Sequence, residues 1–329
     1  MANSLSEKMS GMKKYILWAI AVVITVWLVY PDTTPNTPPP GMVLVETCDL
    51  GHKINFIQAD GIVSKANIKE IFRYDSFGKY FEGYIYSFNF CFRPRHDLRR
   101  MKICGESKSE QVQGMEAFPY NKHNWPRVLY VDKDVIYFSA HVIDKFRHQF
   151  KRGLVIYKLD RKRHVVTLID LNYIGFGISV AQGRIYYTNL ELNIIFYHNG
   201  VATKTGLRGV EVSVSPDGKY LAYMGSNFIT YNKVIKLHDL ESGETKRVTW
   251  NMMTTFEKKI DWSPDSKYFS FKNASDISRT PLMIAEASTG EVVAKIEDRG
   301  RPFMITEDEY KKIMQECNYS SVQESRIED

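Results

Sequence analysis

The sequence predicts an all-β domain built from repeated four-stranded units and carried behind an apolar N-terminal segment. Two closely matching segments begin near residues 214 and 262, which is the spacing of a structural repeat. Aromatic residues make up 13% of the chain, with 20 Tyr and 18 Phe, and many stand beside Val and Ile in short runs that favour strands. With 44% hydrophobic and 25% charged residues, the chain has ample apolar material for a large core.

The N-terminal segment at 15–30 (YILWAIAVVITVWLVY) is an unbroken apolar run. As a helix it would cover roughly 24 Å, somewhat less than the ~30 Å hydrocarbon core of a bilayer. Lys13 and Lys14 precede it, and Trp18 and Trp27 lie near its two ends. These residue types favour the interface between membrane and water. We therefore expect residues 15–30 to form an uncleaved transmembrane anchor.

A cleaved secretory signal is the main alternative for this segment, and a buried helix of a soluble domain is the third. The only Ala-x-Ala pattern in it is at 19–21, and cleavage there would leave a very short apolar core. Lysines precede the span, whereas residues 31–50 contain no Lys or Arg. By the positive-inside rule, residues 1–14 form a cytoplasmic tail and the rest of the chain is exported.

Residues 31–41 (PDTTPNTPPPG) form a linker with five prolines and no residue that favours a core. Such a composition is typical of a polyproline II spacer, which would reach on the order of 30 Å. We expect it to hold the folded domain away from the bilayer.

The repeat is clearest in the segments 214–223 (VSPDGKYLAY) and 262–271 (WSPDSKYFSF). In each, a tight turn is followed by alternating apolar and polar or small residues, as in a hairpin turn that leads into a strand. The expected turn residues are Ser215, Pro216, Asp217, Gly218, Ser263, Pro264, Asp265 and Ser266. Their interpretation is structural, because Pro fixes φ and Gly permits a positive φ.

Each segment is followed by two more predicted strands joined by a Gly-Glu turn. The strands are 234–240 and 245–249 after the first segment, and 282–287 and 292–296 after the second. Four short strands in about 40 to 50 residues is the period of a β-propeller.

This repeat resembles that of TolB-type β-propellers, which are relatives of WD-type blades. The resemblance is carried by SPDGKYLAY at 215–223, KLHDL at 236–240 and SGETKRVT at 242–249, and it is strong over 209–297. It implies the kind of propeller that is common in bacterial periplasmic proteins and in the non-catalytic domains of prolyl-oligopeptidase-like enzymes. Weaker echoes without Ser-Pro-Asp occur upstream, at 77–81, 133–138 and 182–187. We expect residues 42–298 to form about six blades, within a range of five to seven.

The C-terminal segment, 299–329, is predicted to contain one short helix over Glu307–Glu316. Thr306 is the expected N-cap, Glu309 completes a capping box, and Ile305 would contact Tyr310. The apolar stripe of this helix would either dock on the propeller or face a partner. Residues after Asn318 are expected to be disordered.

Four cysteines, Cys48, Cys91, Cys104 and Cys317, fall on the predicted exported side, where disulfides are stable. Three pairings exist. We favour Cys91 with Cys104, which are close in sequence, and Cys48 with Cys317, because the two ends of a propeller must meet. No Cys pair has zinc-ligand spacing, so no metal site is expected.

Three basic clusters are predicted to lie in loops between strands. We interpret them as solvated hairpin tips. The alternative is that they form one positive face that binds an anionic partner such as lipid headgroups, glycan or an acidic protein. A net charge of +6 is too small to indicate nucleic-acid binding. The cluster residues are Arg93, Arg95, Arg99, Arg100 and Lys102; Lys145, Arg147, Lys151 and Arg152; and Arg161, Lys162 and Arg163.

The motifs of common hydrolases and nucleotide-binding enzymes are missing from the sequence, and no catalytic residue or cofactor is assigned. The leading hypothesis is a protein-binding or scaffold module of the bacterial cell envelope, anchored in the inner membrane with its propeller on the periplasmic side. It would bind another envelope protein, and it could be a subunit of an envelope or secretion assembly. The alternative is a glycan hydrolase or lyase, since propellers can gather paired carboxylates from distant blades. A small-molecule or glycan ligand is not indicated by any motif.

Overall fold

The structure is a computed structural model that describes residues 34–48, 53–59, 63–67, 78–88, 98–103, 109–115, 126–142, 153–169, 177–226, 233–249, 260–272, 281–296 and 303–316. The chain divides into two units, residues 1–35 and 36–329. The predicted anchor at 15–30 lies outside the described residues, and none of the helices within them has the length and apolar character needed to span a bilayer.

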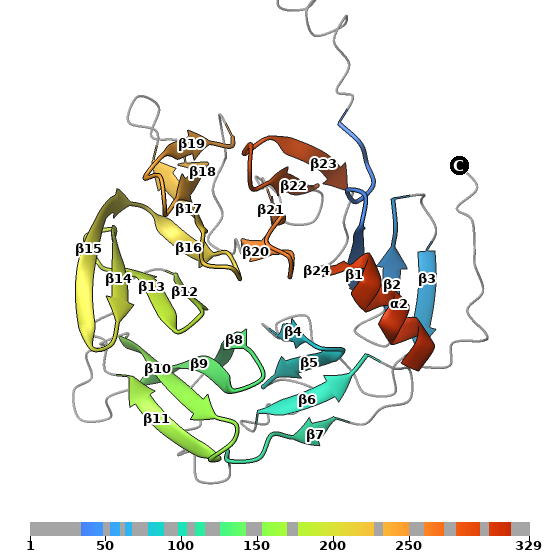
Figure 1. Cartoon of the computed structure of the whole chain (residues 1–329), viewed down its shortest axis with the longest axis horizontal. Coiled ribbons are helices and arrows are strands. Elements are labelled where there is room, and N and C mark those ends of the chain that lie inside the picture. The colour runs from blue at the N-terminus through green and yellow to red at the C-terminus, as the bar shows by residue number, and fades with distance from the viewer. Residues whose placement is uncertain are drawn as a thin grey trace, which may run out of the picture. The chain divides into compact units, whose positions relative to one another are not determined.

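The second unit is a β-propeller whose described residues form six four-stranded antiparallel sheets. Figure 1 shows these sheets placed around a common centre. We number the sheets as blades from the N-terminus and give the strands of each blade from the innermost outward. The all-β class and a blade count of six agree with the sequence prediction.

The first three blades are built from the following strands. Blade 1 contains β24 (Phe303–Thr306), β1 (Met42–Cys48), β2 (Lys53–Ile57) and β3 (Val63–Asn67). Blade 2 contains β4 (Lys79–Phe81), β5 (Tyr84–Ser87), β6 (Arg99–Lys102) and β7 (Glu110–Gln111). Blade 3 contains β8 (Arg127–Val131), β9 (Val135–Val142), β10 (Gly153–Asp160) and β11 (Val165–Ile169).

The last three blades follow the same order. Blade 4 contains β12 (Ile178–Ala181), β13 (Arg184–Thr188), β14 (Asn193–His198) and β15 (Val201–Arg208). Blade 5 contains β16 (Val210–Val214), β17 (Tyr220–Ser226), β18 (Lys233–Asp239) and β19 (Thr245–Arg247). Blade 6 contains β20 (Asp261–Trp262), β21 (Tyr268–Lys272), β22 (Leu282–Glu286) and β23 (Val292–Ile296).

The ring is closed by a strand from the far end of the chain. β24 is the innermost strand of blade 1, and it pairs with β1 so that Met42 lies opposite Thr306 and Val45 opposite Phe303. The sheets therefore extend beyond residue 298, where the sequence placed the end of the propeller. A four-residue strand carries little periodic signal of its own, and its partner is remote in sequence. The two ends of the domain do meet, as closure requires.

The core lies between neighbouring blades, as expected for small sheets that cannot bury their own apolar faces. Between blades 5 and 6, Met224 and Leu237 pack in one cluster with Phe269 and Phe271. Alternation along each strand sends successive side chains to the two neighbouring blades. Met304 of β24 accordingly joins one cluster and Ile305 the next.

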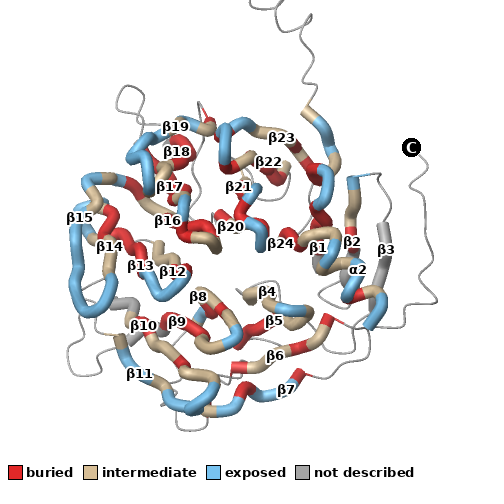
Figure 2. The backbone as a smooth tube through the Cα atoms, in the orientation of Figure 1, coloured by how far each residue is buried: buried red, intermediate tan, exposed pale blue. Residues whose placement is uncertain are grey.

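The C-terminal helix α2 (Glu307–Glu316) has the predicted bounds and docks on the propeller. Its buried residue Ile313 lies in a cluster with Val43 of blade 1 and Ile85 of blade 2. The ring of Tyr310 lies 5.3 Å from that of Phe56, measured between centroids. Docking on the propeller is thus the interpretation of the apolar stripe that is confirmed. Figure 2 shows exposed positions along the rest of the helix.

The end of the predicted linker packs against the domain. Pro38 and Pro39 are buried, and the carbonyl oxygen of Pro39 accepts a hydrogen bond from the N–H of Met42 at 3.1 Å. The backbone N–H of Glu307 donates to the carbonyl of Gly41 at 2.9 Å, so the start of β1 is also tied to α2. This part of the linker is therefore an ordered edge of the propeller.

Candidate functional site

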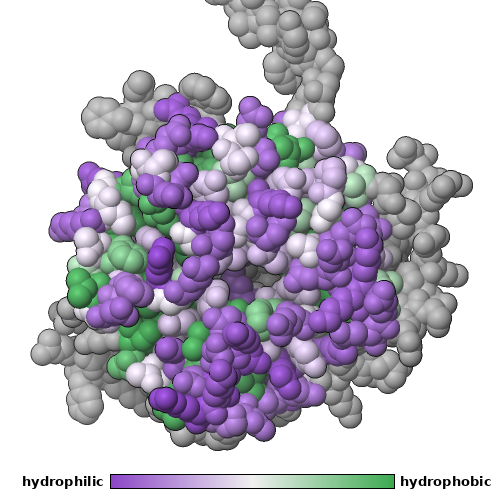
Figure 3. Space-filling model, viewed as in Figure 1, coloured by the Kyte–Doolittle hydropathy of each residue, from purple (hydrophilic) through white to green (hydrophobic). Residues whose placement is uncertain are grey.

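The two ends of the ring differ in their connections. Because the strands of a blade alternate in direction, the turns after its first and third strands lie at one end, which we call the short-turn face. The tight turns at 215–218, 263–266 and 161–164 belong to it. α2 follows directly from β24 and lies on the same face. Figure 3 shows that the face seen there, on which α2 lies, is mostly hydrophilic.

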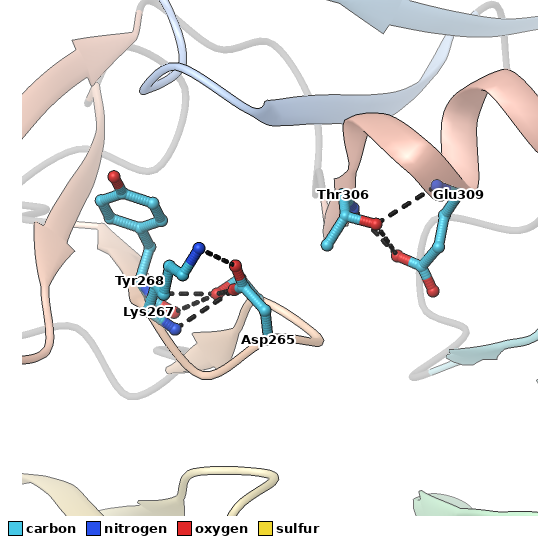
Figure 4. Close-up of polar contacts among 6 residues, drawn as sticks. Asp265, Lys267, Tyr268, Thr306 and Glu309 are labelled. Carbon is cyan, nitrogen blue, oxygen red and sulfur yellow. Dashed lines mark hydrogen bonds and ion pairs between the residues drawn. The ribbon is translucent and has the colours of Figure 1, made fainter.

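The two Ser-Pro-Asp segments form turns that share one geometry. The hydroxyl of Ser215 donates to Asp217 at 2.6 Å and accepts the N–H of Tyr220 at 2.9 Å. Ser263 makes the same contacts, with Asp265 at 2.7 Å and the N–H of Tyr268 at 2.9 Å (Figure 4). The fourth turn residue has a positive φ in each case, 71° at Gly218 and 62° at Ser266. Gly is the natural residue for such a φ, and Ser adopts it at a cost of order 1 kcal/mol.

Hydrogen bonds also join neighbouring blades around the centre of the ring. The backbone N–H of Asp217 donates to the Ser266 hydroxyl at 3.0 Å, which links the turns of blades 5 and 6. On the innermost strands, the hydroxyl of Ser179 accepts the N–H of Val214 at 3.0 Å. The hydroxyl of Ser213 donates to a backbone carbonyl of blade 6 at 2.9 Å. These contacts tie the inner strands of blades 4, 5 and 6 to one another.

One ion pair connects the two blades that flank the closing blade. Lys79 of β4 and Asp261 of β20 come from blades 2 and 6, and their charged groups lie 3.0 Å apart with both side chains partly buried. The ring is therefore held across blade 1 by this contact as well as by β24. A partly buried pair of this kind can contribute more than an exposed one.

Glu309 of α2 and Asp265 of the turn at 263–266 are the two carboxylates on the short-turn face to compare with the glycan-cleaving alternative. Burial raises the pKa of Glu309, and the charge of Asp265 raises it further, while hydrogen bonds from Thr306 oppose the shift. A carboxyl group whose pKa is raised by burial and by the charge of a second carboxylate is a pattern found in acid catalysts.

Both carboxylates are already engaged in the fold. The carboxylate of Glu309 accepts the backbone N–H of Thr306 at 2.9 Å, and the backbone N–H of Glu309 donates to the Thr306 hydroxyl at 3.2 Å, which together form the predicted capping box (Figure 4). Asp265 accepts the Ser263 hydroxyl and, at 3.2 Å, the backbone N–H of Lys267. A proton donor or nucleophile must be free to face substrate, so this arrangement serves the turn and the helix.

The first basic cluster lies partly in a strand, where sequence reasoning expected a loop. Arg99, Arg100 and Lys102 all belong to β6. Arg100 donates to Glu110 at 3.0 Å, and its guanidinium lies 4.9 Å from the ring centre of Tyr84. Arg99 donates to the hydroxyl of Ser109 at 2.7 Å, and Lys102 pairs with Glu316 of α2 at 2.9 Å. These cations have partners within the chain.

The third cluster lies in the turn at 161–164 on the short-turn face, and its members differ in exposure. Arg161 donates to the Tyr86 hydroxyl at 3.1 Å and so links blade 3 to blade 2. Lys162 and Arg163 have exposed side chains, 77% and 83% accessible, and contact Asp134 and Asp160 at 2.7 and 4.0 Å. Exposed ion pairs contribute little free energy, so the side chains of Lys162 and Arg163 can exchange these contacts for contacts with a partner.

Several predicted site residues lie outside the described part of the chain. They are Arg93, Arg95, Lys145, Arg147, Lys151, Arg152, Cys91, Cys104, Cys317 and the side chain of Cys48. The two disulfides and the single positive face therefore stay predictions. Within the described ranges, no group of His, Cys, Asp and Glu could hold a metal ion.

The exposed apolar residues were not found by sequence reasoning. Five large apolar side chains are exposed in the described residues, and all belong to blades 3 and 4: Val165 at 52%, Leu168 at 53%, Leu190 at 59%, Leu192 at 39% and Val201 at 64%. Val165 and Leu168 lie on β11 and Val201 on β15, the outermost strands of these blades. The Asn199-Gly200 pair before β15 is a hairpin signal that would have located this edge strand.

Comparison with known proteins supports the fold. No family model matches the chain, and no curated protein sequence matches it. Among solved structures, TolB from Acinetobacter baumannii has a TM-score of 0.59 at 14% identity, over 82% of this chain and 67% of that one. A putative TolB from Agrobacterium tumefaciens scores 0.48 at 14% identity, over 80% of this chain and 97% of that one. An oligogalacturonate lyase in complex with manganese scores 0.49 at 11% identity, over 81% and 83%. With its six four-stranded blades, the chain has a TolB-like β-propeller fold.

Proposed function

We propose that this chain is a protein-binding module of the bacterial cell envelope, anchored in the inner membrane by residues 15–30 with its propeller on the periplasmic side. The observation that carries the binding role is that, among the described residues, the exposed large apolar side chains all lie in blades 3 and 4. Scattered single apolar residues are normal on a protein surface. Their gathering on two neighbouring blades favours a contact surface.

The internal bonding of the ring supports the same role. The polar groups of the innermost strands and turns bind one another, as in the contacts of Ser213, Asp217 and Lys79 with neighbouring or nearby blades. A ring braced in this way offers a rigid platform, which lowers the entropic cost of binding a partner. The resemblance of the repeat to TolB-type propellers is consistent with a scaffold.

The anchor is tested by fractionation of cells that express the tagged full-length chain. We expect intact protein in the membrane pellet after washes with high salt and alkaline carbonate, and release only by detergent. A control chain in which residues 15–30 are replaced by a cleavable secretory signal should appear in the periplasmic fraction. Recovery of the unprocessed full-length chain in the soluble fraction would rule out the anchor.

The binding role is tested by a photoreactive amino acid placed at exposed positions in the living cell. Thr203 on β15 is the test position and Thr289 of blade 6 is the matched control, because both are exposed threonines. We expect a discrete cross-linked protein from position 203 and none from position 289. The partner must then yield the same adduct when the probe is placed on the partner. Equal, diffuse cross-linking at both positions would contradict specific binding.

A further inference from the structure

We propose that the outer edge of β15 binds an extended, acidic and aliphatic segment of the partner protein by adding a strand to blade 4. This inference rests on the proposed binding role and names its surface. Pairing of a peptide with an exposed sheet edge is a recurrent mode of protein recognition, in which the main chain gives affinity and the side chains give specificity.

β15 is the longest outermost strand among the described residues. It has 8 residues, whereas β3, β11 and β23 have 5, β19 has 3 and β7 has 2. It pairs with β14 on one side, and no described strand pairs with its other edge. Figure 1 shows β15 at the rim of the ring, and Figure 2 shows most of it exposed. Long free edges are the ones that accept another strand.

Exposed aliphatic residues stand at both ends of this strand. Val201 begins β15. At the other end the backbone N–H of Gly209 donates to the carbonyl oxygen of Leu192 at 2.9 Å, which brings the exposed Leu190 and Leu192 beside the end of the strand. A fully extended strand of this length covers roughly 26 Å. A partner segment of similar length would therefore meet an apolar contact at each end.

The charge along the edge selects the partner. Lys204 and Arg208 are the charged residues of β15, and both contact one residue, Glu191. The Lys204 ammonium lies 3.7 Å from the Glu191 carboxylate, whereas Arg208 donates to the backbone carbonyl of Glu191 at 3.3 Å. Lys204 and Arg208 outnumber the single acidic residue Glu191, so the edge keeps a net positive charge. An acidic segment is favoured there, and a second copy of β15 would bring like charges together.

Two further features keep the edge selective. The pairing of β14 with β15 is interrupted by a bulge near Asn193 and Ile195. Gly206 has a φ of 82°, and open space surrounds the position of its missing Cβ. Bulges and edge lysines such as Lys204 hinder indiscriminate strand pairing. An edge with these features admits a segment that matches its charge and resists general aggregation.

The test uses the full-length protein in detergent and two acetylated, amidated eight-residue peptides as probes. One peptide alternates valine with glutamate and the other alternates valine with lysine. Fluorescence anisotropy measures affinity, and hydrogen exchange locates the protected amides. We expect the acidic peptide to protect β15 and to bind about tenfold more tightly than the basic one.

Variants of the protein make the test specific. Lys204→Glu should invert the preference between the peptides, and Val201→Asp should weaken the acidic peptide by about tenfold. Arg247→Glu is the matched control, because Arg247 is an exposed cation on β19, the outermost strand of blade 5, and it should change affinity less than about twofold.

Three results would overturn the proposal. They are no protection of β15 at acidic-peptide concentrations on the order of 1 mM, equal affinity for both peptides, or a loss of acidic-peptide affinity in Arg247→Glu as large as that in the β15 variants. The outcome is separable from that of the proposed function. If a discrete cellular cross-link forms from position 203 while the acidic peptide leaves the β15 amides unprotected, the binding role stands and the addition of an acidic strand is wrong.

Discussion

Ring closure by β24 predicts that Ile305→Ala destabilises the whole propeller. Ile305 is fully buried, with 0% of its surface exposed. It packs in one cluster with Ile313 of α2, Val43 of blade 1 and Met101 of blade 2. It therefore joins the C-terminal segment to the two blades on which α2 lies. A loss of packing at this point weakens the closure and the docking of the helix together.

The size of the effect follows from the atoms removed. Isoleucine to alanine deletes three carbon atoms, worth about 0.8 kcal/mol each in transfer free energy, or roughly 2.4 kcal/mol in all. The cavity left among rigid blades adds to this, and buried Ile→Ala changes cost about 2–5 kcal/mol. We expect a loss of about 3 kcal/mol. This is a large part of the 5–15 kcal/mol that stabilises a typical domain.

The assay is equilibrium unfolding in urea, followed by tryptophan fluorescence on the detergent-solubilised chain. Val201→Ala is the control, because its side chain is 64% exposed and its loss should stay within about 0.5 kcal/mol. Hydrogen exchange of β24 and α2 should rise in the Ile305 variant. A shift no larger than that of the control would refute the view that the C-terminal segment is a structural part of the ring.

Three further predictions test other parts of the structure. Gly209→Ala should cost more than about 2 kcal/mol in urea unfolding, because its Cβ would lie 2.6 Å from the carbonyl oxygen of Met224; a variant as stable as the wild type would contradict this packing. Ser215→Ala should cost about 1–3 kcal/mol, since its buried hydroxyl bonds twice within the turn, whereas Ser242→Ala on the surface should be nearly neutral. Burial raises the pKa of Glu309, so its protonated form favours folding, and this contribution is lost as pH rises through the folded pKa. Unfolding at pH 4 to 8 should therefore show wild-type stability falling relative to Glu309→Gln as pH rises, and a constant difference would contradict the shift.

Much of the fold could be predicted because its signals are local. The predicted strand 292–296 coincides with β23, and the predicted helix coincides with α2. In both cases the turn or cap residues stand next to the element that they define, as Thr306 and Glu309 do for the helix. A pattern contained within a few residues can be read without knowing what the segment will touch.

The features that could not be predicted depend on contacts between remote residues. Lys79 and Asp261 are far apart in sequence, and neither lies in a motif, so only the closed ring brings them together. Glu309 was predicted as a helix cap, but its burial, which is the main cause of its raised pKa, and the smaller effect of the Asp265 charge both depend on how α2 docks on the closed ring. The exposure of Val201 likewise depends on the position of β15 at the outer edge of its blade, which composition does not reveal.

The repeat is clear in some blades of the propeller and faded in others, and the exposed apolar residues lie in blades where it has faded. The sequence match is strong over blades 5 and 6, where the Ser-Pro-Asp turns repeat the same hydrogen bonds and pair with each other through Asp217 and Ser266. The exposed aliphatic residues and the long free edge lie in blades 3 and 4, where the repeat has faded. A residue kept by the repeat serves what all blades need, which is folding and contact with the next blade. A residue specific to one blade is free of that constraint, and a group of such exposed apolar residues favours contact with something outside the ring. Binding surfaces in a propeller are therefore best sought where the repeat fails, and the proposed edge of blade 4 lies in that part of the ring.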